Sequence, residues 1–388
     1  MAEYNPSSLW DVLDDYPDAN RSRSVDLYLA SQSHEHQERL AAGLDYLVDH
    51  STPSFEEAGL ADMGGGIIIS YQEAPNIVHA LTQYGLQRGQ PNIRIVGYLN
   101  WPETLDSRAA KDTRNLLDNF IARNPHVPFA YFEDEEPTPL CIGEVRKMPE
   151  DILQPLTSDT ALHFSHDADM RSMTPTHLAD LYRNYRERNL PAVIPHTHNE
   201  QLPNHPNINR VMSWIDDREL REMRDNFFEP GPAFSAKAYR EVGGYSHAYL
   251  GETSKLVRKI AAEYGLRAPA DIRVPEAGLA LSPRRFVAKF LASKALEHLW
   301  DGPEDFSASE KYRDLTHDDL QTVPDIPPEQ VAEYLREFGP EVLRQIAQKN
   351  EFIEDGTAER IDLIFQLEAI KDRLGAPDDM FDFDNWRY

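Results

Sequence analysis

Two carboxylates spaced one residue apart, Asp167 and Asp169, form the pattern best suited to holding a metal ion. They follow a short apolar run at 161–164, which is typical of a buried strand. Residues i and i+2 of an extended segment point the same way, so both side chains can address one site. Carboxylate oxygens combined with phosphate oxygens suit Mg²⁺ or Mn²⁺. An inert acidic turn is the alternative, but a position between a strand and a helix near Pro175 favours a ligand site.

A third carboxylate, Glu252, is expected at or just before the start of a helix, where the helix dipole stabilises negative charge. A short helix before it is expected to end at Gly243 and Gly244, which tolerate positive φ angles. On spacing alone, the simplest role for Glu252 is to cap its helix. A role in proton transfer is the alternative.

The segments around these carboxylates alternate between strand and helix patterns, which predicts an α/β fold with a mostly parallel, doubly wound sheet. The expected strands are 67–69, preceded by Gly64 to Gly66, and 93–99, 129–132, 161–164 and 192–194. The expected helices between them begin near Pro75 and cover 104–122 and 176–188. We expect a helical N-terminal extension at 1–60, an α/β domain at 61–283 and a helical C-terminal region at 284–388.

The composition excludes several classes of protein. A net charge of −27 over 388 residues disfavours nucleic acids and anionic membranes as partners, although a small anion can still bind in a basic or metal-lined pocket. The single cysteine, Cys141, excludes an internal disulfide framework and a multi-cysteine metal site. We find neither a signal-peptide pattern nor an apolar run of about 18 residues, so we expect a soluble, cytoplasmic protein.

Four motifs, in this order, resemble the GT-A glycosyltransferases of the large family 2 type over residues 65–285. The motifs are the strand and turn at 67–77, the basic segment at 142–147, the Asp-x-Asp motif at 167–169, and the stretch from Arg240 to Glu252. Each motif is weak alone, and their order and spacing make the set specific. The resemblance implies a GT-A, Rossmann-like mixed sheet flanked by helices, with helical N- and C-terminal extensions.

The resemblance also implies roles for individual residues. It assigns the nucleotide to Ser70, Tyr71, Glu73 and Asn100 and the donor phosphates to Arg146 and Lys147, assigns a divalent cation, Mn²⁺ or Mg²⁺, to Asp167 and Asp169, and places Glu252 toward the acceptor. The implied activity is that of a non-processive, metal-dependent glycosyltransferase of the hexosyltransferase type. It would move a sugar from a nucleotide-sugar donor to an acceptor hydroxyl on a glycan, a lipid-linked molecule or a small molecule.

The sequence departs from the family where Thr253 stands in place of an expected acid. Either Glu252 is the base that takes the acceptor proton, or the enzyme is a retaining one that needs no such base. Asp217, with its neighbour Asp216, is a reserve candidate for the base.

Several further residues keep more than one interpretation. His196 and His198, with His205 nearby, are interpreted as structural or exposed residues, with His198 as a third metal ligand or donor contact in one alternative and a separate zinc site in another. Arg284 and Arg285 either reach the donor diphosphate or belong to a helix packed on the domain. That segment limits any membrane contact to a peripheral one.

Two other functions are alternatives to this interpretation of the sequence. One is a catalytically inactive, glycosyltransferase-like protein that binds sugar nucleotides. The other is a sugar-nucleotide nucleotidyltransferase, which needs a glycine-rich loop after its first strand, whereas Gly64 to Gly66 are expected before it. The sequence does not identify the donor sugar, the nucleotide base, the acceptor or the stereochemical outcome. It also leaves open the oligomeric state, and a homo-oligomer is one of the alternatives.

The metal assignment generates a direct prediction. We expect Asp169→Asn to abolish metal-dependent turnover of a nucleotide sugar, because one of two anionic ligands is lost. Turnover assayed with and without Mn²⁺ tests this, and full activity of the variant would refute the assignment.

Overall fold

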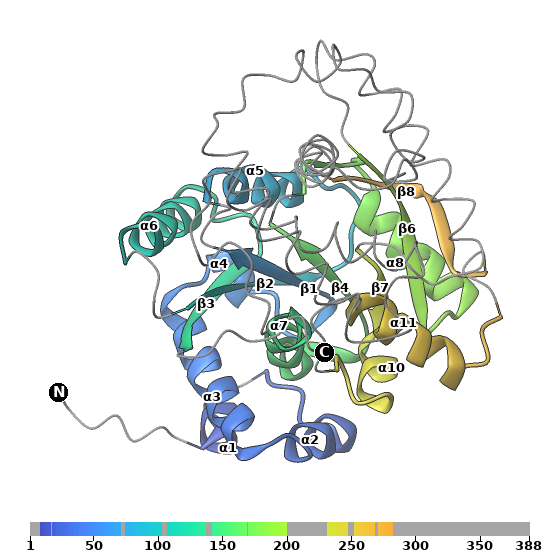
Figure 1. The fold of residues 1–388 in the computed structure, drawn as a ribbon, viewed down its shortest axis with the longest axis horizontal. Helices are drawn as coiled ribbons and strands as arrows, with labels where there is room; N and C mark the ends of the chain where they lie inside the picture. Colours follow the sequence, from blue (N-terminus) through green and yellow to red (C-terminus); the bar gives the residue numbers. More distant parts are fainter. Residues whose placement is uncertain are drawn as a thin grey trace, which may run out of the picture. The chain divides into compact units, whose positions relative to one another are not determined.

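The structure is a computed structural model and describes residues 8–16, 18–70, 74–102, 107–136, 142–168, 170–199, 231–246, 252–267 and 271–281 (Figure 1). The chain divides into two compact units, and the elements described below lie in the larger one, residues 1–198 and 220–281, apart from Asn199. The helices expected beyond residue 283 lie outside the described residues. None of the described helices is long and apolar enough to span a membrane.

A mixed eight-stranded sheet forms the centre of this unit. Its strands are β1 (Ala61–Ser70), β2 (Ile93–Pro102), β3 (Phe129–Glu136), β4 (Thr157–Asp167), β5 (Ser172–Met173), β6 (Ala192–Asn199), β7 (Ala233–Ser235) and β8 (Arg273–Leu281). Their order is β3-β2-β1-β4-β7-β6-β8-β5. The first four of these are parallel, β7 is antiparallel to β4 and β6, and β5 is antiparallel to β8. The predicted α/β layout, a mixed and mostly parallel sheet flanked by helices, is confirmed.

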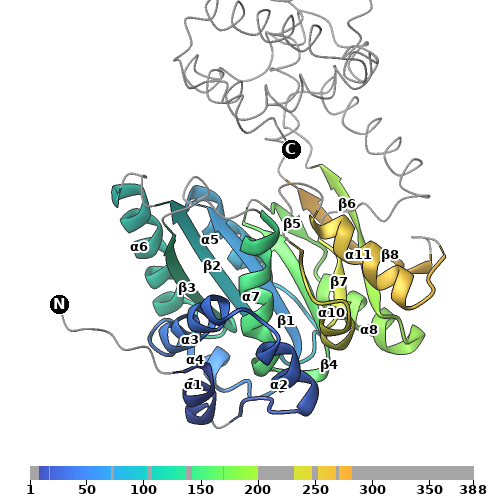
Figure 2. The same cartoon turned by 60° about the horizontal axis from the view of Figure 1, so that its bottom comes forward.

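Helices cover both faces of the sheet, which explains why the strands read as continuous apolar runs. Ile67 and Ile69 of β1 belong to one core cluster, and Ile68 between them belongs to the other. The Ile67 side packs against α5 (Ala74–Gly85), α6 (Ser107–Arg123) and α8 (His177–Arg188). The Ile68 side packs against α1 (Leu9–Asp15), α2 (Arg23–Ala30), α3 (His34–Asp49), α4 (Pro53–Glu56), α7 (Ile142–Leu156), α10 (Ala236–Glu241) and α11 (Glu252–Glu263) (Figure 2).

The glycine run at 64–66 lies inside β1, so the expectation that it precedes the strand is wrong. A Cβ atom on Gly65 would lie 2.2 Å from Cζ of Phe164 in β4, and one on Gly66 would lie 2.7 Å from Oε1 of Glu150 in α7. The three glycines therefore allow the side chains of neighbouring elements to lie against the backbone of β1. Their role is close packing within the sheet.

Several elements differ from the sequence prediction. Residues 142–147, expected as a basic segment, form the first turns of α7, a helix that contains Pro149 and Pro155. Strands β5, β7 and β8 were not predicted, and β8 contains Pro275 and Gly278, which depress strand propensity. β4 continues past the predicted 161–164 and ends at Asp167, which places that carboxylate at the carboxyl edge of the sheet.

The packing of Gly65 against Phe164 can be tested by substitution. We expect Gly65→Ala to lower the free energy of unfolding by about 1–3 kcal/mol, because the added methyl group overpacks the contact with the Phe164 ring. Urea denaturation measures the loss. In a Phe164→Leu background, the same change should cost clearly less, because the shorter side chain leaves room. Equal costs in both backgrounds would contradict this account.

Candidate active site at the carboxyl edge of the sheet

The strand order defines where a ligand site is expected. β1 lies between β2 and β4, so the chain reverses direction across the sheet at β1. Ligands of open α/β sheets bind at such a switch point, outside the carboxyl ends of the strands. The register brings Asn100 of β2 beside Ser70 of β1, and Asp167 of β4 beside Ile68 of β1. Three of the predicted site residues thus meet at one edge.

Arg146 of α7 is the centre of a polar cluster at this edge. Its Nε donates to Oε1 of Glu252 at 2.7 Å, and its Nη2 donates to Oδ1 of Asp167 at 2.7 Å. Its Nη1 donates to Oγ of Ser165 at 3.2 Å. The structure therefore brings together three residues that the sequence assigned to donor phosphates, metal and acceptor. Ser165 was missed, although its place two residues before Asp167 puts it on the same face of the strand.

The cluster is largely removed from water, since Arg146 is 9% exposed and Glu252 is 7% exposed. Burial by itself lowers the pKa of Arg146, but the nearby charges of Asp167 and Glu252 outweigh it, so the pKa lies above its ordinary value. The guanidinium is therefore charged. Two carboxylates around one cation leave the trio with a formal charge of −1.

Glu252 is the first residue of α11, as predicted from the sequence. Its Oε1 accepts a second hydrogen bond, from Oγ1 of Thr253 at 3.2 Å. Tyr245, which follows the positive-φ glycines Gly243 and Gly244, is buried close to Arg146 and was not predicted. The carboxylate of Glu252 therefore belongs to a buried side-chain cluster, in addition to its expected place at the start of a helix.

Lys147 does not join this cluster. Its Nζ donates to Oδ2 of Asp151 at 2.6 Å and to the hydroxyl of Tyr28 at 2.6 Å. Asp151, which is fully buried, also accepts from Tyr239 at 2.8 Å and contacts Nε2 of His36 at 2.8 Å. Burial by itself raises the pKa of Asp151, but Lys147 and His36 have the larger and opposite effect. The pKa therefore lies below its ordinary value, at about 2. Lys147 therefore joins α2, α3 and α10 to α7.

The two histidines beside the acidic motif are buried and neutral. His163 contacts Oγ1 of Thr157 at 2.8 Å, and burial lowers its pKa to about 3. Nδ1 of His166 pairs with the hydroxyl of Tyr84 at 2.8 Å, and burial again holds its pKa well below the usual value. His163 thus packs within the sheet and takes no part in the Arg146 cluster.

His196 and His198 lie on β6, where their rings stack with centroids 6.0 Å apart, and His198 is exposed. Within the described ranges, no group of three or more His, Cys, Asp or Glu side chains is placed to hold a metal ion.

Several predicted site residues lie outside the part of the chain that the structure describes. These residues are Tyr71, Glu73, Asp169, His205, Asp216, Asp217, Arg284 and Arg285. Ser70 is described in its backbone only. Asn100 is placed by the register, and its Nδ2 donates to the hydroxyl of Tyr98 at 3.1 Å.

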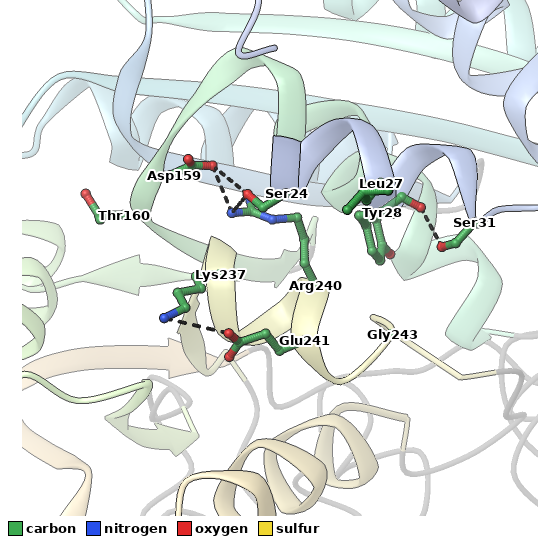
Figure 3. A pocket seen from close by; sticks show the side chains of 10 residues that line it. All are labelled: Ser24, Leu27, Tyr28, Ser31, Asp159, Thr160, Lys237, Arg240, Glu241 and Gly243. Atoms are coloured by element: carbon green, nitrogen blue, oxygen red, sulfur yellow. Dashed lines mark hydrogen bonds and ion pairs between the residues drawn. The ribbon is translucent and has the colours of Figure 1, made fainter. Parts of the chain in front are cut away.

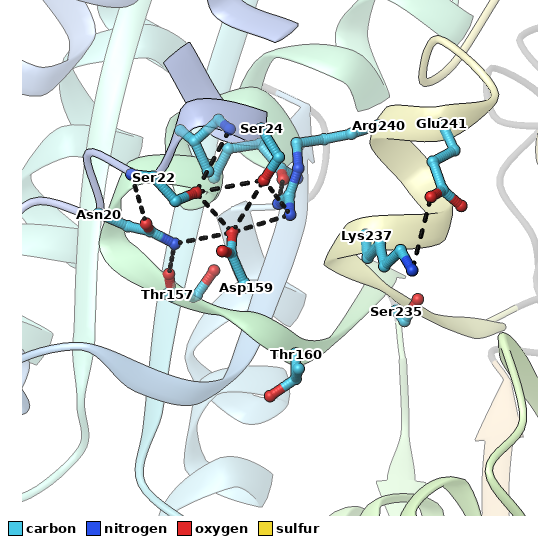
Figure 4. Close-up of polar contacts among 12 residues, drawn as sticks. Asn20, Ser22, Ser24, Thr157, Asp159, Thr160, Ser235, Lys237, Arg240 and Glu241 are labelled. Atoms are coloured by element: carbon cyan, nitrogen blue, oxygen red, sulfur yellow. Dashed lines mark hydrogen bonds and ion pairs between the residues drawn. The ribbon is translucent and has the colours of Figure 1, made fainter. Parts of the chain in front are cut away.

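A groove of ≈ 540 Å³ lies near the other end of β4, between α2 and α10 (Figure 3). Asp159 in its wall lies eight residues before Asp167, roughly 25 Å away along an extended strand. Oδ1 of Asp159 accepts from Oγ of Ser22 at 2.7 Å and from Nη2 of Arg240 at 3.0 Å (Figure 4). These contacts explain the groove as the polar joint between α2 and α10, remote from the Arg146 cluster.

Known proteins resemble the chain only distantly. No protein-family model matches the chain, and no curated protein matches it. Among solved structures, the mannosyltransferase PcManGT from Pyrobaculum calidifontis, in complex with GDP-Man and Mn²⁺, is 15% identical over 92% of this chain and 99% of that chain, with a TM-score of 0.40. S. aureus TarS 1–349 is 9% identical over 81% and 82%, with a TM-score of 0.38. At these TM-scores the similarities establish neither a shared fold nor a shared activity.

The buried cluster around Asp151 makes a pH-dependent prediction. We expect Asp151→Asn to lower the free energy of unfolding by about 3–5 kcal/mol at pH 7, because the buried Lys147 loses its counter-charge. The pKa of Asp151 is lowered to about 2, so its contribution is complete above pH 4 and is lost as the pH falls toward 2.

Urea denaturation between pH 7 and pH 2 measures this, and the difference between wild type and variant should shrink only below pH 4. The control is Asp26→Asn, whose partly exposed pair with Arg21 should contribute no more than about 1 kcal/mol. A difference that stays constant down to pH 2 would contradict the assignment.

Proposed function

We propose that this protein is a metal-dependent glycosyltransferase of GT-A fold and family 2 type that transfers a sugar from a nucleotide-sugar donor to an acceptor hydroxyl. The observation that carries the proposal is the cluster in which Arg146 joins Asp167 to Glu252 at the switch point of the sheet. The motif resemblance assigns these same residues to the donor, the metal and the acceptor. Their meeting in one place supports that assignment.

On the donor side, Ser70, Tyr71, Glu73 and Asn100 would hold the nucleotide at the ends of β1 and β2. Arg146 supplies a fixed positive charge for the diphosphate. Asp167 is suited to a hard divalent cation, because it offers a carboxylate at the strand end with 24% of its side chain exposed. Asp169 would be the second ligand. When bound, Mn²⁺ or Mg²⁺ would stabilise charge on the departing nucleoside diphosphate.

On the acceptor side, the carboxylate of Glu252 would act as general base. The acceptor oxygen forms a bond to the anomeric carbon of the donor sugar, and the bond from that carbon to the phosphate oxygen breaks. The electron pair of the broken bond leaves with the nucleoside diphosphate. The hydroxyl proton moves to Glu252, which later returns it to solvent.

The placement of the glycines bears on one alternative. A sugar-nucleotide nucleotidyltransferase needs a glycine-rich loop after the first strand. Gly65 and Gly66 instead lie within β1, packed beneath Phe164 and Glu150. The ion pair of Glu252 with Arg146 favours a second candidate, an inactive sugar-nucleotide binding protein, because it engages one oxygen of the proposed base. Turnover separates this candidate from the enzyme.

Ligand stabilisation tests the donor site. Nucleoside diphosphates and nucleotide sugars with Mn²⁺ should raise the melting temperature, because a ligand that binds only the folded chain stabilises it. The same screen without Mn²⁺ should give a smaller rise. If no nucleotide shifts the melting temperature, the proposed donor site is wrong.

Turnover tests the base. With a donor that stabilises the protein, we expect Glu252→Gln to keep the melting shift but to lose about 10²–10⁴-fold in transfer rate. Release of nucleoside diphosphate in the presence of an acceptor panel measures the rate. Donor binding by wild type without any turnover would identify the inactive binding protein.

A further inference from the structure

We propose that Thr253 and Arg146 are positioning residues that fix Glu252 so that only its Oε2 takes the acceptor proton. This inference rests on the proposed function. It gives Thr253, which stands where the family pattern expects an acid, a specific task. It also names which oxygen of the base reacts.

The hydrogen bonds of Glu252 separate its two oxygens. Oε1 accepts from Nε of Arg146 at 2.7 Å and from Oγ1 of Thr253 at 3.2 Å. A carboxylate oxygen has two lone-pair sites, so these two donors use the accepting capacity of Oε1. Every contact described for this carboxylate falls on Oε1. Oε2 is therefore the oxygen that can accept a proton from an incoming hydroxyl.

Arg146 is itself held firmly, so it can position another group. Its planar guanidinium also donates to Asp167 at 2.7 Å and to Ser165 at 3.2 Å, both on β4. A guanidinium presents its donors in a rigid plane, so three bonds from Nε, Nη1 and Nη2 to three different acceptors fix its orientation. The carboxylate at the start of α11 is thereby held at a set place relative to the end of β4, where the donor would lie.

The hydroxyl of Thr253 fits this arrangement better than a second acid would. Arg146 already serves two carboxylates, Asp167 and Glu252. An aspartate at position 253 would add a third negative charge beside them, and like charges this close disfavour ionisation of one another. A threonine donates to Glu252 without adding charge. The departure from the family pattern therefore removes a competing carboxylate and keeps one oriented base.

The reaction step that follows is specific in its atoms. The acceptor oxygen bonds to the anomeric carbon while the bond from that carbon to the leaving phosphate oxygen breaks, and the electron pair departs with the diphosphate. The acceptor proton goes to Oε2 of Glu252. Oε1 keeps its two hydrogen bonds throughout, so the carboxylate does not need to rotate. Avoiding that rotation preserves the geometry needed for attack.

Two variants at position 253, one without the hydroxyl and one that keeps it, test the inference. Thr253→Val has nearly the same shape as wild type and lacks the donor, and Thr253→Ser keeps the donor. We expect Thr253→Val to lower kcat about 3- to 10-fold, the loss that one hydrogen bond produces. Thr253→Ser should stay within about twofold of wild type. The KM for the donor and the melting shift given by a nucleoside diphosphate with Mn²⁺ should be unchanged in both.

Arg146→Lys provides the second arm, because it keeps the charge and removes the fork. We expect a drop in kcat of about 10- to 100-fold with the nucleoside diphosphate still raising the melting temperature, since misplacement of a reacting group costs rate more than binding. A melting shift retained by each variant shows that it is folded and binds the nucleotide.

The outcomes separate this inference from the proposed function. Equal kcat values for Thr253→Val and wild type overturn the inference alone. A loss of the nucleotide melting shift in Thr253→Val also overturns it, because Thr253 would then act on the donor. No turnover by the wild-type chain with any donor refutes the proposed function and the inference together.

Discussion

The buried charge of Arg146 is the constraint on which the site depends. A guanidinium at 9% exposure is unfavourable unless its donors are paired, and the partners of Arg146 come from two separate elements. The end of β4 supplies Asp167 and Ser165, and the start of α11 supplies Glu252. Segments about 100 residues apart must therefore meet at one point. All three partners of Arg146 are therefore in place only when this edge of the sheet is correctly assembled.

One helix connects this edge to the rest of the domain. α7 crosses from β3 to β4 on the face that the N-terminal helices also cover. Asp151, which follows Arg146 in the same helix, contacts Lys147, His36 and the hydroxyls of Tyr28 and Tyr239. The helix thus carries a charged anchor for α2 and α3 close to the site cation. Different polar groups hold the N-terminal helices and the sheet edge, but both sets include side chains of α7.

The sequence predicted the sheet well where a segment is decided by its own residues. Apolar runs located β1 to β4, and Gly243 and Gly244 correctly ended α10 before the helix that begins at Glu252. Prediction failed where distant contacts decide. The helix α7 was missed because it contains Pro149 and Pro155, although its apolar face packs on the sheet. Gly65 was expected before the strand, and its contact with Phe164 explains its place inside β1. Lys147 seemed equivalent to Arg146 because their separation is visible only once both are known to lie on a helix.

That separation has a consequence for how this region tolerates change in length. Consecutive residues of a helix are rotated by about 100° around its axis, and this rotation alone sends Arg146 to the sheet edge and Lys147 to the buried anchor. Inserting or deleting one residue in the first turn of α7 would turn Arg146 away from the sheet edge, so that the carboxylates of Asp167 and Glu252 would lose their cation. Substitutions along the helix surface keep this phase, whereas a gap destroys it. Descendants of this chain should therefore vary in α7 by replacement and not by length.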